Sequence, residues 1–167
     1  MTIANYIVVL RIILIPVLIA LLVLLPDYQG RLWSALFFLV LAFSDWLDGY
    51  LARKTRTVTS LGKLIDPLSD KLLVVSVLIV LLGFGEINFW PVLIIVFREL
   101  AVEGLRSLQM MKRVVVGASF LGKVKTVLQM MAVLFLILKL PFSNLILWLA
   151  VALTILSGLD YLMDLVQ

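Results

Sequence analysis

Two side chains that carry much of protein chemistry are missing from this sequence, which contains no cysteine and no histidine. Without cysteine, disulfide frameworks, thiolate metal sites and cysteine nucleophiles are excluded. Without histidine, acid–base chemistry near neutral pH must use carboxylates, lysine, tyrosine or a bound metal. Charge is also scarce, because 14% of the 167 residues are charged whereas 64% are hydrophobic. An average soluble domain is about 45–50% apolar, so this composition indicates a polytopic membrane protein.

The hydrophobic residues fall into six runs, each close to the roughly 20 residues that a helix needs to cross a bilayer. Charged or turn-forming residues separate the runs, and Gly83 and Gly85 predict a turn between the third and fourth. We therefore predict an all-α fold, an integral membrane bundle of six transmembrane helices, in a single domain over residues 1–167. The expected helices cover residues 6–25, 32–53, 64–82, 89–111, 121–138 and 145–165.

Basic residues gather in alternate connections between these helices. They lie around the second and fourth connections: Arg53, Lys54, Arg56, Lys63, Lys112 and Arg113. The positive-inside rule puts these connections, and with them both termini, in the cytoplasm. The net charge of +4 suits such a basic membrane face, and no soluble basic patch suggests binding to nucleic acid.

Four aspartates lie at the cytoplasmic ends of the second and third expected helices. Asp45 and Asp48 are three residues apart, which puts both on one helix face. Asp66 and Asp70 are four residues apart, with the same consequence. Because a short connection joins two antiparallel helices, we expect the four carboxylates to converge. One or two divalent cations would relieve their repulsion, and oxygen ligands favour Mg²⁺, Mn²⁺ or Ca²⁺.

Small residues separate the two aspartate pairs and let a ligand approach the backbone closely: Gly49, Ala52 and Gly62. A purely structural alternative is that the aspartates form ion pairs at the water interface. Basic side chains are available for it: Arg53, Lys54, Lys63 and Lys71. However, charge within membrane segments is costly, and four acids exceed what anchoring requires. We therefore favour a metal site.

The fourth expected helix carries a second charged group. Glu99, Glu103 and Arg106 share one face of this helix, and Arg98 lies to one side. Ion pairs inside the bundle account for part of this set. An arginine in excess of those pairs is a candidate to bind an anion.

Two lysines, Lys123 and Lys125, open the fifth expected helix on the same cytoplasmic side. A helix N-terminus there adds partial positive charge and free N–H groups for a phosphate. Anchoring at a basic membrane face would by itself explain either lysine. We favour anion binding by the combined basic group: Arg98, Arg106, Lys123 and Lys125.

One arginine, Arg11, lies deep within the first expected helix and requires a partner. It either faces the bundle and meets an acidic group or a phosphate, or extends its long side chain to the cytoplasmic interface. The sequence favours neither alternative.

The aspartates form a longer pattern, Asp45-x2-Asp48-Gly49-x2-Ala52-Arg53-x8-Gly62-x3-Asp66-x3-Asp70. This pattern resembles the signature of the CDP-alcohol phosphotransferase family at every fixed position. Residues 5–16, 97–106, 122–130 and 154–161 are similar to the bacterial branch of that family known as phosphatidylglycerophosphate synthases. The N-terminus departs from that branch, which often has proline where Ala4 stands and threonine where Val8 stands.

The resemblance implies a six-helix enzyme of the cell inner (plasma) membrane, multi-pass, often homodimeric, with its active site on the cytoplasmic side. Its reaction would transfer the phosphatidyl group from CDP-diacylglycerol to sn-glycerol 3-phosphate, giving phosphatidylglycerol phosphate and CMP. Membrane lipid and a second copy of the chain are the other partners that the resemblance implies.

The resemblance also implies roles for individual residues. Two Mg²⁺ or Mn²⁺ ions would be held by four aspartates: Asp45, Asp48, Asp66 and Asp70. Asp70 would in addition act as general base on the acceptor hydroxyl. The CDP donor would lie against Asp48, Gly49, Ala52, Arg53, Gly62 and Asp66. The acceptor phosphate would meet Arg98, Arg106, Lys123 and Lys125.

Two alternatives stay open at this point. Within the family, the acceptor could be inositol phosphate, serine or phosphatidylglycerol instead, although the basic group favours a phosphorylated acceptor over serine. From another class, intramembrane acids are compatible with a divalent-cation transporter. Against a transporter, the aspartates cluster at one membrane face rather than at the midplane, and no internal repeat appears.

Overall fold

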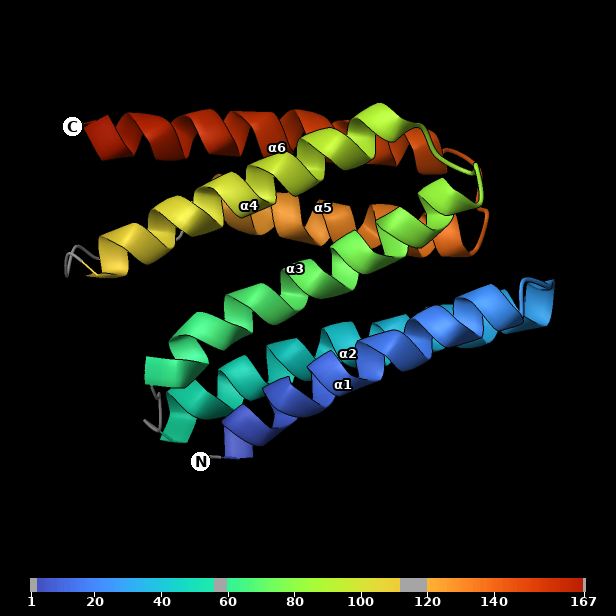
Figure 1. Ribbon diagram of the computed structural model, residues 1–167, viewed down its shortest axis with the longest axis horizontal. Coiled ribbons are helices and arrows are strands. Elements are labelled where there is room, and N and C mark those ends of the chain that lie inside the picture. The colour runs from blue at the N-terminus through green and yellow to red at the C-terminus, as the bar shows by residue number, and fades with distance from the viewer. Residues whose placement is uncertain (1–2, 56–59, 112–119, 167) are drawn as a thin grey trace. The chain divides into compact units, whose positions relative to one another are not determined.

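The computed structural model describes residues 3–55, 60–111 and 120–166, which form six helices and no strand (Figure 1). The helices are α1 (Ile3–Leu24), α2 (Tyr28–Thr55), α3 (Ser60–Gly83), α4 (Phe89–Met111), α5 (Phe120–Ile137) and α6 (Ser143–Val166). The predicted all-helical fold is confirmed over these residues, and the bounds of α4 agree with the sequence. The helices α2 and α3 begin four residues earlier than predicted, because the backbone hydrogen bonding of each helix begins in polar residues that precede its apolar run.

The chain divides into two compact units, Met1–Val80 and Leu81–Gln167, here called the N-terminal and C-terminal units. In the N-terminal unit α1 packs against α2, and Figure 1 shows the two running in opposite directions. A close approach at Gly30 makes this hairpin tight. A Cβ atom at position 30 would lie 2.1 Å from the carbonyl oxygen of Leu25, so only glycine fits there.

In the C-terminal unit α6 packs against both α4 and α5. The turn before α4 has Gly85 at a φ of 71°, in agreement with the turn that its glycines predict. The turn before α6 has Lys139 and Phe142 at φ values of 52° and 64°. An ion pair of 3.1 Å between Lys139 Nζ and Glu86 Oε1 links these two turns.

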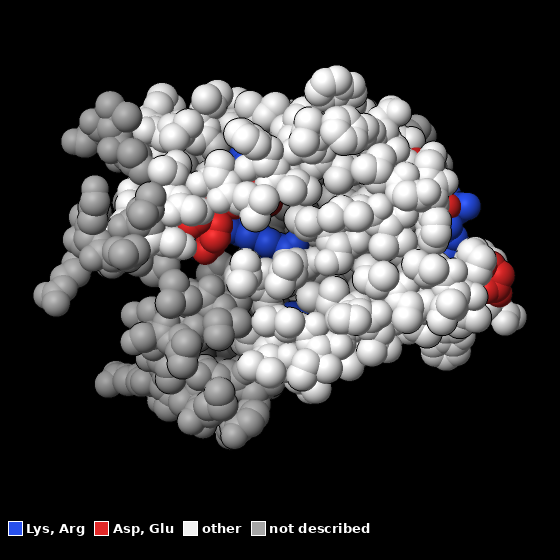
Figure 2. Space-filling model, in the orientation of Figure 1, with Lys and Arg blue, Asp and Glu red and all other residues white. Residues whose placement is uncertain are grey.

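Several charged side chains are buried within the hydrophobic core, and many large apolar side chains are exposed. Buried positions include Arg11, Glu99 and Lys125, whereas large apolar side chains such as Trp33 and Phe97 are exposed. Figure 2 shows a visible face on which most of the described surface is uncharged. Soluble proteins rarely expose large contiguous apolar areas, so this distribution favours a lipid environment.

One helix among the described residues is long and apolar enough to cross a membrane, over Ser143–Met163. Two shorter apolar stretches, Val8–Leu24 and Lys71–Gly83, lie in α1 and α3. Charged residues interrupt the apolar runs of the other helices, as Arg98, Glu99 and Glu103 do in α4. The six membrane crossings therefore stay a prediction.

Candidate active site

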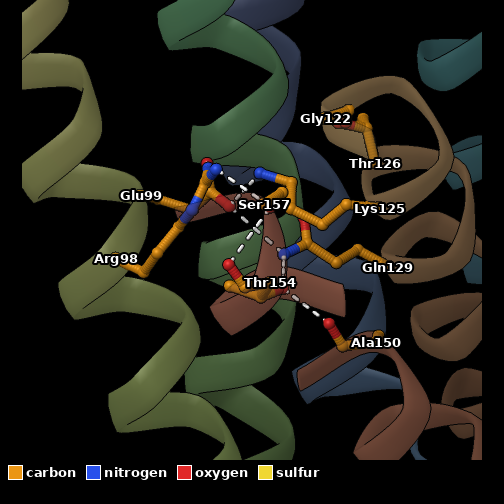
Figure 3. A network of polar contacts seen from close by, with 9 residues as sticks. All are labelled: Arg98, Glu99, Gly122, Lys125, Thr126, Gln129, Ala150, Thr154 and Ser157. Carbon is orange, nitrogen blue, oxygen red and sulfur yellow. Dashed lines mark hydrogen bonds and ion pairs between the residues drawn. The ribbon is translucent and has the colours of Figure 1, made fainter. Parts of the chain in front are cut away.

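A network of polar side chains occupies the interior of the C-terminal unit, and Figure 3 shows its members pointing toward one another. Arg98 and Glu99 come from α4, and Lys125 and Gln129 from α5. Thr154 and Ser157 come from α6. Residues four apart on α5 and three apart on α6 share a helix face, which explains why each helix presents two polar groups here.

The carboxylate of Glu99 lies at the centre of this network. Lys125 Nζ donates a hydrogen bond to Glu99 Oε1 and forms an ion pair with it. Gln129 Nε2 donates to the same oxygen at 3.2 Å, and Arg98 Nη1 lies 3.6 Å from Glu99 Oε2. Glu99 is 3% exposed and Lys125 is 4% exposed, so both charges are removed from water and need each other.

Hydroxyl groups of α6 complete the network. Gln129 Nε2 donates to Thr154 Oγ1 at 2.9 Å, and Arg98 Nη2 donates to Ser157 Oγ at 3.0 Å. Thr154 Oγ1 donates in turn to the backbone carbonyl of Ala150, and Ser157 Oγ donates to the backbone carbonyl of Thr154. Because each hydroxyl proton is used in a bond within α6, the hydroxyl oxygen can only accept a hydrogen bond from a neighbouring helix.

Positive charge exceeds negative charge in the centre of this network, because two cations, Arg98 and Lys125, share one carboxylate. Among the described side chains, Arg98 Nε and Arg106 Nε are buried without a hydrogen-bond partner. Buried donors of this kind favour an acceptor that arrives with a ligand. The arrangement can therefore bind an anion such as a phosphate.

The structure brings some of the predicted anion-binding residues together and separates others. Arg98 and Lys125 meet through Glu99, as described above. Arg106 lies eight residues further along α4, about two helical turns away. Lys123 is exposed although Lys125 is buried, since residues two apart on α5 lie on different faces.

An apolar groove of about 400 Å³ lies between α4 and α6 beside this network. Phe97, Leu105 and Leu159 are among its lining residues, and Arg98 is its one charged lining residue. Gly158 also lines it, and a Cβ atom there would lie 3.3 Å from Cγ and Nε of Arg98. Glycine at this position leaves the space that the Arg98 side chain occupies.

The signature aspartates lie on the two helices where the sequence places them. Asp45 and Asp48 are in α2 together with Gly49, Ala52 and Arg53, and α3 contains Gly62, Asp66 and Asp70. The side chains of these eight residues lie outside the described part of the structure. Among the side chains that the structure does describe, no three acidic residues cluster in a way that could hold a metal. The convergence of the aspartates stays a prediction.

Two described residues next to these aspartates share a partner on α1. Arg11 of α1 donates from Nη1 to Ser69 Oγ at 2.9 Å and from Nε to Ser44 Oγ at 3.4 Å. Ser44 directly precedes Asp45, and Ser69 directly precedes Asp70. Carboxylate oxygens are ligands that Mg²⁺ and Mn²⁺ accept, so the residue types present fit such an ion.

Sequence reasoning left the orientation of Arg11 open, and the structure shows that it faces the interior at 1% exposure. The reasoning missed the hydroxyl and amide groups that surround the two arginines and Glu99. These are Ser44, Ser69, Gln129 and Ser157, which bond to them directly, and Thr154, which accepts from Gln129. A signal for them exists, because each is a polar residue within an otherwise apolar helix.

Comparison with known proteins agrees with the aspartate pattern. A family model described as CDP-alcohol phosphatidyltransferase matches residues 1–156. A relative from Bacillus subtilis (strain 168) is 41% identical, over 94% of this chain and 91% of its own length. One from Rickettsia bellii is 42% identical, over 94% and 91% of the two chains. Both are named CDP-diacylglycerol–glycerol-3-phosphate 3-phosphatidyltransferase. The chain belongs to the CDP-alcohol phosphatidyltransferase family.

Proposed function

We propose that this protein transfers the phosphatidyl group of CDP-diacylglycerol to sn-glycerol 3-phosphate, giving phosphatidylglycerol phosphate and CMP. The observation that carries this proposal is the similarity over 94% of the chain to relatives whose names state both substrates. That overlap includes the helices of the aspartate signature and those of the buried polar network. The activity belongs to phospholipid biosynthesis.

The acceptor phosphate is bound by the basic group of the C-terminal unit: Arg98, Arg106, Lys123 and Lys125. The excess of positive charge around Glu99 supports this assignment, as do the buried donors of Arg98 and Arg106. Serine carries no phosphate and would not supply an acceptor for the buried Nε donors of Arg98 and Arg106. Inositol phosphate carries one, so the choice between it and glycerol 3-phosphate depends on the measurement below.

Two Mg²⁺ or Mn²⁺ ions are held by Asp45, Asp48, Asp66 and Asp70. When bound, such ions offset the negative charge of the pyrophosphate and stabilise the oxygens that attack and leave. The same stretch receives the CDP group. Gly49, Ala52 and Gly62 leave space for cytidine and pyrophosphate, and Asp48, Arg53 and Asp66 contact them. The helical spacing of the aspartates in α2 and α3 supports this assignment.

In the transfer step, a hydroxyl oxygen of the acceptor attacks the β-phosphorus of CDP-diacylglycerol. A new oxygen–phosphorus bond forms to the acceptor, and the bond from the β-phosphorus to the bridging oxygen of CMP breaks. CMP leaves with the electron pair of that bond. The carboxylate of Asp70 accepts the hydroxyl proton, and the chain offers no histidine for this role.

The protein acts as a single multi-pass domain of the inner (plasma) membrane, with both termini and the site on the cytoplasmic side, and as a homodimer. Exposed apolar side chains and buried charges support the membrane setting, together with the long apolar stretch of α6. The basic connections support the orientation. In this setting the acyl chains of the donor stay in lipid while the water-soluble acceptor arrives from the cytoplasm.

The test is CMP release from CDP-diacylglycerol by the purified protein, with Mg²⁺ or Mn²⁺ and with glycerol 3-phosphate, inositol phosphate or serine in turn. We expect release only with metal and glycerol 3-phosphate together. Release with a different acceptor would show that our assignment of the acceptor is wrong and that the reaction class is right. Absence of release, combined with Mn²⁺ flux into liposomes containing the protein, would overturn the enzyme proposal in favour of a cation transporter.

A further inference from the structure

A buried arginine in the N-terminal unit links three helices at one level. Arg11 of α1 donates to Ser69 of α3 at 2.9 Å and to Ser44 of α2 at 3.4 Å. Arg11 is 1% exposed and Ser69 is fully buried, so water does not compete for the bond between them. Ser44 in turn donates to the carbonyl oxygen of Leu41 at 2.7 Å, which holds its hydroxyl in place.

The two serines that meet Arg11 are each next to an aspartate of the signature. Ser44 precedes Asp45 on α2, and Ser69 precedes Asp70 on α3. A single rigid, planar guanidinium therefore sets how far apart α2 and α3 lie at the point where they carry those aspartates. A metal ion is sensitive to such spacing, because its affinity depends on ligand geometry to a fraction of an ångström.

We propose that Arg11 is a positioning residue that holds α2 and α3 at the spacing at which their aspartates bind a divalent cation. This proposal rests on the metal site of the proposed function. Arg11 acts on the ion through the two helices, and its guanidinium is not a ligand.

Charge and position predict opposite effects when Arg11 is replaced. A cation beside the aspartate-bearing segments repels a divalent ion, so through charge alone a neutral residue at position 11 would tighten metal binding. If Arg11 acts by positioning the two helices, any residue that cannot bond to both serines would weaken metal binding. Lysine keeps the charge but donates from a single nitrogen, whereas Arg11 donates from two separate ones.

The experiment measures Mn²⁺ binding by electron paramagnetic resonance of the full-length protein in detergent, without substrate. For Arg11→Gln and Arg11→Lys we expect the dissociation constant for Mn²⁺ to rise about 10–100-fold, the usual effect of losing a partner that orients metal ligands. Ser69→Ala, which removes one acceptor and leaves the arginine, should raise the constant in the same direction. This milder change decides the matter if the Arg11 variants do not fold.

A matched control is Arg31→Gln. Arg31 is also a buried arginine of this unit and donates from Nε to the carbonyl oxygen of Pro26 at 3.2 Å. It lies fourteen residues before Asp45, about 21 Å along α2, so its loss should lower thermal stability without changing Mn²⁺ affinity.

The outcomes separate this inference from the proposed function. Unchanged Mn²⁺ affinity in Arg11→Lys or Ser69→Ala, or tighter binding in Arg11→Gln, would overturn the positioning role while the metal site stands. Failure of the unmodified protein to bind Mn²⁺ would overturn the metal site and this inference together.

Discussion

At the residue scale, one carboxylate determines how the C-terminal unit holds its charges. Glu99 meets Arg98 from its own helix and Lys125 from α5. The side chains of Glu99 and Lys125 are shielded from water, whereas that of Arg98 is 14% exposed. A buried ion pair contributes little net stability compared with apolar residues of similar size, but breaking it strands a charge in a medium of low polarity. The stability of this charged group therefore depends on Glu99 more than on either Arg98 or Lys125.

Replacing Glu99 with glutamine should destabilise the protein strongly. Lys125 would then be buried without its counter-charge, which costs about 3–5 kcal/mol. Thermal unfolding in detergent should show a large drop in Tm for Glu99→Gln and partial recovery when Lys125→Met is added. The control is Glu86→Gln, which breaks the ion pair to Lys139, whose side chain is 59% exposed. Exposed pairs contribute roughly 0–1 kcal/mol, so equal effects of the two changes would contradict a special role for Glu99.

Replacing Asp70 with asparagine should nearly abolish turnover while the donor still binds. Asparagine keeps the size of the side chain but cannot accept the acceptor's proton, and loss of a general base typically lowers kcat by about 10²–10⁴. The measurement is CMP release at saturating substrates, with CDP-diacylglycerol binding measured separately. Substantial remaining turnover would remove Asp70 from the role of base.

At the scale of the elements, one face of α6 carries the hydroxyls that accept hydrogen bonds from α4 and α5, and the glycine beside Arg98. Thr154 and Ser157 accept hydrogen bonds from α5 and α4, and Gly158 leaves room for Arg98. Spacings of three and four residues put these positions on the same side of the helix. The contact of α6 with both neighbours thus orients the arginine that we assign to the acceptor phosphate.

Adding a single methyl group at Gly158 should disturb acceptor binding. The new Cβ would lie 3.3 Å from Cγ and Nε of Arg98, so the arginine would have to shift. We expect Gly158→Ala to raise the KM for glycerol 3-phosphate about tenfold, equivalent to ~1.4 kcal/mol, with little change in the KM for the lipid donor. Equal increases for the two substrates would count against the assignment of Arg98.

Gly104→Ala is the control for this change. Gly104 also lies within a helix, α4, but nothing lies within 4 Å of the position that a Cβ would take. Alanine there should leave both KM values unchanged and stabilise the helix by roughly 1 kcal/mol.

At the scale of the whole molecule, the orientation in the membrane can be tested directly because the chain contains no cysteine. Cysteines introduced at Phe84 and Phe142, both exposed in turns between helices, should react with an impermeant maleimide added outside intact cells. One at the exposed Lys123 should react only after the membrane is opened. Labelling of all three from outside would contradict a six-crossing topology with a cytoplasmic site.

The sequence by itself determined the helical class, the six helices, the aspartate pattern and the family. These features are local, because apolar runs, turn residues and three- or four-residue spacings lie within single helices. The bounds of α4 agree with the prediction for this reason, and so does the turn at Gly85. The earlier starts of α2 and α3 were not predictable from apolar runs, since polar residues continue those helices.

Only the tertiary structure decided which polar side chains meet. Lys123 and Lys125 look alike in sequence, but the rotation of α5 against its neighbours buries one beside Glu99 and exposes the other. Arg11 had two possible environments, and the packing of α1 turns it toward Ser44 and Ser69. Such contacts join residues 26–58 positions apart, and they depend on how helices are rotated and shifted against one another, which no local spacing encodes.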